Sequence, residues 1–369
     1  MSDSTLPTTA ERERLLLAPF ALHSSDSQGR RYDEQEHPYR GPFQRDRDRI
    51  LHSAAFRRLS GKMQVFTGDR GDYHRTRLTH THEVASIART LGRGLRLNED
   101  LIEALAFFHD IGHPPFGHAG EDALAECMSA QGGFSHNQHA LTIAEELEVR
   151  YPAFPGLNLT AEVLDGQRVR ANKDSPTMRP LLEVQLVDLA DSITYNAHDT
   201  DDAVKLKLVT IDELSEIELV RESLEWIHQQ HANLTDEYLR MSLVHQLLDC
   251  QVSDVLDHCA GELTRAGFAT AEEARAFQLR ESPELAEKKK ALERFLYERV
   301  YRHPELIEVR SRAQQQLRQM FERLCQRPDL LPSRFQERAR QYGVPRSVTD
   351  YIAGMTDRFC TNMYKRLFE

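Results

Sequence analysis

NEDLIEALAFFHDIGHPP, residues 98–115, is the stretch that decides the fold expected for this chain. Asn98 has the side chain of a helix N-cap, and the apolar run after it predicts a helix that reaches His109 and Asp110. Gly112 and the following Pro-Pro pair end this helix. Side chains in the last turn of a buried helix are held by packing on one side and face a cavity on the other. Such a position suits a metal ion with open coordination positions.

A second helix is predicted from RLTHTHEVASIARTLGRGL, residues 77–95. Apolar residues lie 4, 7 and 11 positions after His80 and form one stripe of a helix with it. His80 therefore faces the interior. His82 instead shares its line with a serine and two arginines, which is typical of a solvated face. His80 is thus the candidate ligand of this helix.

A third apolar helix, LLEVQLVDLADSITYNAHDTDD at residues 181–202, carries acids on its inner side. One line along it contains Val184, Asp188, Asp191, Tyr195 and His198. Isolated carboxylates are costly to bury, so two acids on one stripe need a cation or hydrogen bonds. Asp188 and Asp191 are both candidates for a further ligand, and the pattern alone does not choose between them.

The joint pattern carries more weight than any single residue in it. Any one of the 17 histidines is more often a surface residue or a hydrogen-bonded core residue than a ligand. An inward histidine, a His-Asp pair that closes an apolar helix and an inward aspartate on a third helix are together much less ordinary. We therefore predict a metal centre built from three helices.

Composition excludes several other classes of protein. The 369 residues, 40% of them hydrophobic, contain no stretch near the roughly 18 apolar residues of a membrane span, and the N-terminus lacks the pattern of a signal peptide. A soluble, cytoplasmic protein is expected. Five cysteines without a CxxC pair favour reduced thiols over disulfides or a thiolate zinc site. The net charge of -11 does not favour a nucleic-acid surface, although arginines cluster in QRDRDRIL and FRRLSGK.

The helical periodicity predicts an all-α fold in three parts. Residues 1–40 are polar and aperiodic, and we expect an irregular N-terminal arm. Residues 41–210 contain the three helices described above and form the expected core. Residues 211–369 alternate charged and apolar residues and are expected to be a C-terminal helical region packed on that core.

Four segments resemble one known family. The spacing H…HD…D, read with HDIGHPPFGHAGE, is similar to that of the HD-domain metal-dependent phosphohydrolases. More narrowly, RDRDRILHSAAFRRLSGKMQVF, RTRLTHTHEVASIARTLGRGL, FFHDIGHPPFGHAGEDAL and DYIAGMTDRF resemble the dGTPase-like deoxynucleoside triphosphate triphosphohydrolases. That resemblance implies an HD-domain helical core and hydrolysis of a dNTP to deoxynucleoside and inorganic triphosphate, by cleavage between the α-phosphorus and the 5′ oxygen.

The resemblance also implies roles for individual residues. It makes His80, His109, Asp110 and Asp191 the ligands of one divalent ion, and so favours Asp191 over Asp188. It makes His118 and Glu121 an acid/base pair, with His136 of FSHNQ as a further catalytic histidine. The substrate contacts that it implies are His113 on the phosphate path, Arg77 on the α-phosphate, Gln64 and Asp199 on the sugar 3′ hydroxyl, and Tyr195 against the 2′ carbon.

Physical chemistry is consistent with these roles but leaves several open. If a helix begins near His118, Glu121 three residues later is expected to orient the His118 ring. Which of His118 and His136 acts as acid or base does not follow from sequence. Two histidines and two carboxylates accept Mn, Mg, Fe, Co or Zn.

Two rival functions stay open beside the dNTP reaction. One is an HD-domain phosphohydrolase that acts on nucleoside monophosphates or other nucleotides. The other is a non-catalytic protein that senses nucleotides or binds single strands. The family resemblance implies deoxynucleoside triphosphates as substrates and candidate allosteric effectors, and a homo-oligomer. No membrane partner is expected, and a nucleic-acid partner is not indicated.

Overall fold

The computed structural model describes residues 7–64, 75–172, 179–231 and 233–369. In these ranges the chain is helical, and its β pairing is limited to two isolated bridges, Arg30 with Thr160 and Met63 with Thr76. The all-α prediction is therefore confirmed. Among the described residues, no helix combines the length and the apolar character needed to cross a membrane.

The chain forms two compact units. Unit 1 comprises Met1–His23, Glu83–Ile102 and Arg179–Ile307, and unit 2 comprises Ser24–His82, Glu103–Met178 and Glu308–Glu369. The helices α4 (Arg77–Gly94), α5 (Glu99–Phe108) and α15 (Pro304–Gln326) each contribute residues to both. The expected boundaries at residues 40 and 210 stay a prediction.

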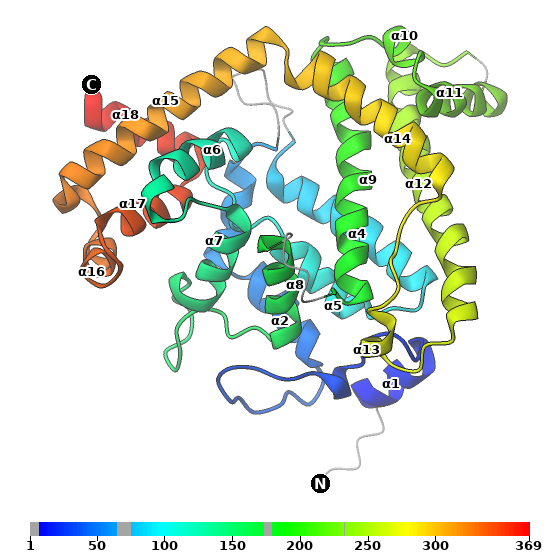
Figure 1. Ribbon diagram of the computed structural model, residues 1–369, viewed down its shortest axis with the longest axis horizontal. Helices are drawn as coiled ribbons and strands as arrows, with labels where there is room; N and C mark the ends of the chain where they lie inside the picture. Colours follow the sequence, from blue (N-terminus) through cyan, green and yellow to red (C-terminus); the bar gives the residue numbers. More distant parts are fainter. Residues whose placement is uncertain (1–6, 65–74, 173–178, 232) are drawn as a thin grey trace. The chain divides into compact units, whose positions relative to one another are not determined.

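Unit 1 is built around the long helices α9 (Leu182–Lys205) and α12 (Asp236–Ala266), which pack against each other (Figure 1). Thr235 caps α12, because its side chain accepts a hydrogen bond from the Tyr238 N–H, and Gly267 ends it in the left-handed conformation. The other elements of this unit are α1 (Thr9–Leu16), α10 (Ile211–Leu214), α11 (Glu218–Gln230), α13 (Ala271–Ala274), α14 (Pro283–Phe295) and the π-helical turn η5 (Leu296–Tyr301).

Helix α1 corrects the expectation of an irregular arm over residues 1–40. The side chain of Thr8 accepts a hydrogen bond from the Glu11 N–H, and the Glu11 carboxylate accepts one from the Thr8 N–H. This reciprocal capping box satisfies two backbone donors at the helix start and stabilises a turn that hydrophobic periodicity does not reveal.

Unit 2 contains the remaining helices. They are α2 (Pro42–Leu51), α3 (Ala54–Arg58), α6 (Gly117–Cys127), α7 (His136–Thr142), α8 (Ala161–Ala171), α16 (Ser333–Tyr342), α17 (Val344–Ala353) and α18 (Asp357–Phe368). Short turns join them: η1 (Ser24–Asp26), η2 (Leu59–Gly61), η3 (Ser129–Gln131), η4 (Ile143–Leu147) and η6 (Pro328–Leu330).

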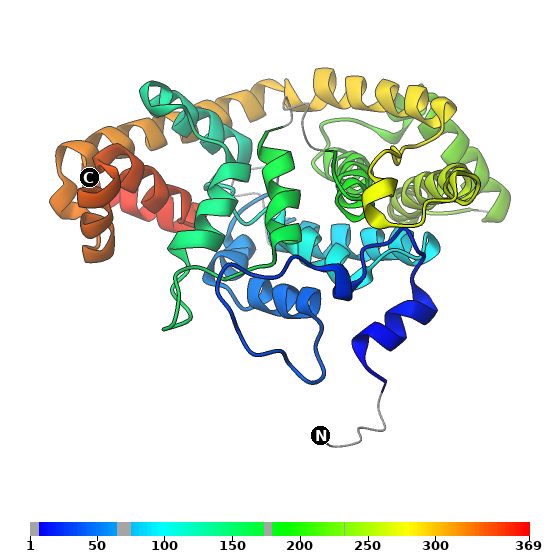
Figure 2. The same cartoon turned by 60° about the horizontal axis from the view of Figure 1, so that its bottom comes forward.

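An apolar core holds the C-terminal helices of unit 2 to α6. Leu124 of α6 packs with Leu317 and Met320 of α15, Phe335 of α16 and Ile352 of α17, all of them buried. Both views show α16, α17 and α18 close together, and in Figure 1 α6 lies beside α17 and α18 (Figure 1; Figure 2). Because α6 begins at Gly117, this core fixes the helix that carries His118 and Glu121.

Candidate metal centre and active site

Three of the four expected metal ligands come together in unit 2. His80 lies in the first turn of α4, and His109 and Asp110 directly follow the last residue of α5. Each offers one ligand atom, and the three atoms lie within 4.8 Å of one another. All three side chains are buried, and His82 on the same helix as His80 is exposed, as the periodicity predicts.

The donor set fits a divalent ion. The Nδ1 atom of His109 lies 2.5 Å from the Ala106 carbonyl oxygen, so Nδ1 carries the proton and donates it to that oxygen. The lone pair is therefore on Nε2, the atom that lies 3.5 Å from Oδ1 of Asp110. A histidine held by one nitrogen to a backbone carbonyl, with the other nitrogen beside a carboxylate oxygen, has the arrangement of a metal ligand.

Arg77 shares the Asp110 carboxylate with the histidines. Its Nη1 donates to Oδ2 of Asp110 at 2.9 Å, and Nε2 of His113 lies 3.1 Å from Oδ1. Although burial alone would raise the pKa of Asp110, Arg77 and the adjacent His109 and His113 hold it well below its usual range. The carboxylate is thus ionised, as a metal ligand must be.

A second group of titratable side chains adjoins the first through His113. The rings of His113 and His136 stack with their centroids 3.8 Å apart, and the His118 ring lies 5.3 Å from that of His113. Burial and the charge of Arg77 keep the pKa of His113 well below its usual value. Ligand atoms of His113, Glu121 and His136 lie within 4.8 Å of one another, which makes this a further possible cation site.

The structure corrects the expected partner of Glu121. Its carboxylate accepts hydrogen bonds from Nδ1 of His136 at 2.8 Å and from the His136 backbone N–H at 2.9 Å. Helix α6 does begin at Gly117, as the expected orientation of His118 required. The Glu121 side chain nevertheless turns toward α7, and the exposed His118 ring contacts the rings of His113 and His136.

Two glycines allow the close approaches that this group needs. A Cβ on Gly112 would lie 2.0 Å from the His136 carbonyl oxygen and 2.5 Å from the Ala140 nitrogen, so only glycine permits α7 to pack there. Gly117 has φ +57, and a Cβ on it would lie 2.9 Å from Nη2 of Arg77. Both positions lie in the HDIGHPPFGHAGE segment.

Lys62 is a buried residue near this site that the sequence analysis missed. Its Nζ donates to the carbonyl oxygens of His113 and Ala353, the second at 2.9 Å. Burial and the nearby Arg58 lower its pKa to about 7. Through these two hydrogen bonds, Lys62 links the His113 segment and the end of α17. GKMQVF gave no periodic signal of this burial.

Gln64 lies next to Arg77. Its backbone oxygen is 3.4 Å from Nη2 of Arg77, and its side-chain Oε1 is buried without a hydrogen-bond partner among the described residues. A buried acceptor without a donor costs free energy, and a hydroxyl of a bound molecule would satisfy it.

The other expected site residues lie on α9, in unit 1. Asp191 and Tyr195 are half-buried and Asp199 is buried, whereas Asp188 is exposed, contrary to the inward position that the stripe predicted. Asp199 accepts a hydrogen bond from the hydroxyl of Tyr301, whose ring lies 6.0 Å from that of Tyr195. Burial and the charge of Asp199 raise the pKa of Tyr301.

Comparison with known proteins identifies family models and relatives that match this sequence. A family model described as HD domain matches residues 77–196, and one described as phosphohydrolase-associated domain matches residues 279–366. A deoxyguanosinetriphosphate triphosphohydrolase-like protein of Geobacter metallireducens is 42% identical, and the match covers 97% of this chain and 96% of the relative. Proteins of the same name from Caulobacter sp. (strain K31) and Nitrosomonas europaea are 41% and 40% identical over 95% of the chain, covering 96% and 98% of the relatives.

Proposed function

The chain belongs to the HD-domain family of deoxyguanosinetriphosphate triphosphohydrolase-like proteins, and on that basis we propose that it hydrolyses deoxynucleoside triphosphates to deoxynucleosides and inorganic triphosphate. The single observation that carries the proposal is the buried group His80, His109 and Asp110. Its acid, Asp110, accepts from Arg77 and lies 3.1 Å from the titratable His113. The residues that we propose as metal ligands, as the cation that binds phosphate (Arg77) and as proton carriers thus adjoin one another in unit 2.

His80, His109 and Asp110 would hold the divalent ion, and we propose Asp191 of α9 as the fourth ligand. When bound, such an ion acts as a Lewis acid on a phosphoryl oxygen and lowers the pKa of coordinated water. Mn, Mg, Fe, Co and Zn all suit two histidines and two carboxylates, so the ion's identity is part of the test below.

The chain's own residues would orient the substrate and move protons. We propose that Arg77 neutralises charge on the α-phosphate, a role supported by its guanidinium group lying against the carboxylate of the proposed ligand Asp110. In the reaction, a water oxygen bonds to the α-phosphorus, the bond from that phosphorus to the 5′ oxygen breaks, and the leaving oxygen gains a proton. One group must accept the proton of the water and another must supply that of the leaving oxygen.

We propose His136 and His118 as the two proton carriers. Glu121 holds the proton of His136 on Nδ1, which leaves Nε2 to exchange a proton with the reacting groups. His118 is exposed beside the same rings and carries the second proton. Replacing Glu121 should therefore reproduce the loss caused by replacing His136 rather than that caused by replacing His118.

The remaining proposals concern the sugar and the assembly. Gln64 and Asp199 would bind the 3′ hydroxyl, and Tyr195 would exclude a 2′ hydroxyl by contact with the 2′ carbon. The buried acceptor of Gln64 and the Tyr301–Asp199 hydrogen bond support these roles. We also propose a cytoplasmic homo-oligomer with deoxynucleotides as allosteric effectors.

Product analysis tests the proposal directly. The purified chain is incubated with each of the four dNTPs and with their ribose counterparts, in the presence of each of several divalent ions, and the products are separated by chromatography. We expect deoxynucleoside and triphosphate from the deoxy substrates. Orthophosphate with a shorter nucleotide would instead identify an HD phosphohydrolase of other specificity. Asp110→Ala should lose both bound metal and turnover, whereas a pure nucleotide-binding protein would tolerate it.

A further inference from the structure

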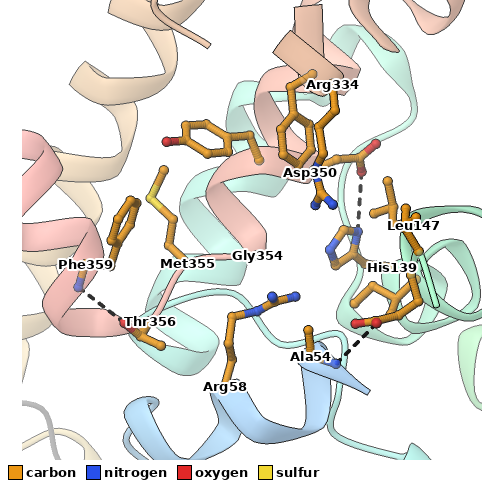
Figure 3. A pocket seen from close by; sticks show the side chains of 15 residues that line it. Ala54, Arg58, His139, Leu147, Arg334, Asp350, Gly354, Met355, Thr356 and Phe359 are labelled. Atoms are coloured by element: carbon orange, nitrogen blue, oxygen red, sulfur yellow. Dashed lines mark hydrogen bonds and ion pairs between the residues drawn. The ribbon is translucent and has the colours of Figure 1, made fainter. Parts of the chain in front are cut away.

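Unit 2 contains a pocket of about 380 Å³, and none of the residues that line it belongs to the proposed metal centre or substrate site. Residues of α3, α7, η4, α16, α17 and α18 line it, together with the turn between the last two helices (Figure 3). Its volume is that of a site for a small molecule.

Two arginines give the pocket its charge. Figure 3 shows the side chains of Arg58 and Arg334 directed toward the same space. Neither guanidinium makes an ion pair or hydrogen bond with any described residue, and Nε of Arg58 is also buried. Burial lowers the pKa of Arg58, the charge of Glu148 partly offsets this shift, and the charge of Arg334 lowers the pKa further, so the two arginines lie close enough to repel each other. Two converging guanidinium groups that no carboxylate contacts directly are an arrangement that an anion would stabilise.

The carboxylates of the pocket already have other partners. Glu148 accepts hydrogen bonds from the backbone N–H groups of Ala54 and Ala55 at 3.2 and 2.8 Å. Asp350 accepts one from Nε of Arg338 at 2.7 Å. Neither acid is hydrogen-bonded to Arg58 or Arg334, so the donors of both guanidinium groups are available to a ligand, although the charge of Glu148 partly offsets that of Arg58.

The rest of the wall is apolar and aromatic, apart from His139 and Thr356. His139 is buried, and neither of its ring nitrogens makes a hydrogen bond among the described residues, although Nδ1 lies 3.4 Å from Oδ1 of Asp350. Phe335, Tyr351 and Phe359 supply aromatic surface, and the Arg334 guanidinium lies 4.6 Å from the centre of the Phe335 ring. A ligand would therefore meet both cations and flat apolar surface.

We propose that this pocket binds a small organic anion that carries a phosphate group and a flat apolar group. The phosphate would be held between Arg58 and Arg334, and the apolar group would lie against the aromatic wall. A small molecule is favoured over a polymer because the site is a partly open pocket of only about 380 Å³, on a chain whose net charge is -11.

Phenyl phosphate is the probe that tests this pocket. Its binding to the full chain is measured by titration calorimetry with EDTA present, so the result does not depend on hydrolysis. Arg58→Gln and Arg334→Gln should each weaken binding about tenfold, as expected for loss of one charge-assisted hydrogen bond. Arg340→Gln is the matched control, since Arg340 is exposed on the same helix as Arg334 and outside the pocket. It should bind like the unmodified chain.

Three further outcomes decide the proposal. Inorganic phosphate should bind more weakly than phenyl phosphate and lose affinity in the same two variants. Unchanged affinity in Arg334→Gln overturns the proposal even if Arg58→Gln fails to fold, because Arg334 is a surface residue whose loss leaves the core intact. A single-stranded oligonucleotide that binds more tightly than phenyl phosphate, with the same dependence on Arg58 and Arg334, would overturn the small-molecule assignment.

Discussion

Replacing Arg77 by methionine should destabilise the metal-free chain, and the structure sets the size of the effect. Arg77 is 1% exposed and donates to Asp110, which is 4% exposed. Methionine fills much of the same volume but leaves the carboxylate of Asp110 buried without its cation. Breaking one partner of a buried ion pair costs about 3–5 kcal/mol. We expect that loss in the local free energy of unfolding around Asp110.

The assay has to report on unit 2. The single tryptophan, Trp226, lies in unit 1, so its fluorescence does not follow this site directly. Hydrogen exchange of the amides in residues 103–116, followed by mass spectrometry in EDTA, measures the local opening free energy instead. The double variant Arg77→Met/Asp110→Asn removes both charges, and it should be at least as stable as Arg77→Met alone.

Metal addition separates this explanation from a simple packing defect. A cation bound beside Asp110 replaces the lost charge, so at the same free Mn²⁺ concentration Arg77→Met should gain more stability than the unmodified chain, by roughly 1.4 kcal/mol for each tenfold by which its Kd is lower. Arg49→Met breaks a less deeply buried pair, Arg49 with Glu34 at 2.6 Å, away from the ligand group. It should gain no more from Mn²⁺ than the unmodified chain does. The reasoning is refuted if the stability loss of Arg77→Met/Asp110→Asn equals the sum of the losses of the two single variants within about 0.5 kcal/mol.

Three other predictions follow from the same contacts. Glu121→Gln should lower kcat roughly a hundredfold, because the Nδ1 proton of His136 then faces a neutral amide oxygen instead of a carboxylate that stabilises the charged ring; steady-state kinetics that instead show unchanged kcat would exclude this role. Gly112→Ala should destabilise unit 2 by about 1–3 kcal/mol in thermal melts followed by circular dichroism, since its Cβ would overlap the Ala140 nitrogen. Burial lowers the pKa of His139, so below pH 6.5 the unfolded chain binds a proton that the folded chain does not, and stability falls as pH falls by up to about 1.4 kcal/mol per unit. His139→Gln should lose less stability between pH 7.5 and 5.5 than the unmodified chain, and an equal loss would contradict this account.

Hydrophobic periodicity predicts which side of a helix is buried, and for the helix that carries His80 the prediction is correct. The stripe through His80 separates it from the exposed His82. The helix predicted to reach His109 and Asp110 instead ends at Phe108, so these two residues lie in the turn that follows α5. The prediction from periodicity fails at Asp188, which lies on the same expected stripe as Asp191 but is exposed. A helix of 24 residues such as α9 does not keep one face buried along its whole length, because its neighbours change from turn to turn.

Contacts between distant segments are beyond what a local pattern determines. The capping box of α1 can be predicted from Thr8 and Glu11, but this short, charged helix has no apolar stripe that would indicate a helix. Lys62 is buried because two carbonyl oxygens, those of His113 and Ala353, converge on it from distant parts of the chain. Tyr301 reaches Asp199 across about a hundred residues in the same way. Such partners are selected by tertiary packing.

The partner of Glu121 shows why the site chemistry needs the fold. Sequence spacing makes His118 and Glu121 neighbours on α6, and helix geometry alone allows them to meet. The close packing at Gly112 brings the start of α7 against the loop that follows α5. His136, the first residue of α7, then offers Glu121 two donors, a ring nitrogen and a backbone N–H. Two hydrogen bonds to one carboxylate outweigh a single contact with an exposed ring. Experiments on the acid/base chemistry should therefore treat His136 and Glu121 as one hydrogen-bonded pair and His118 as a separate residue.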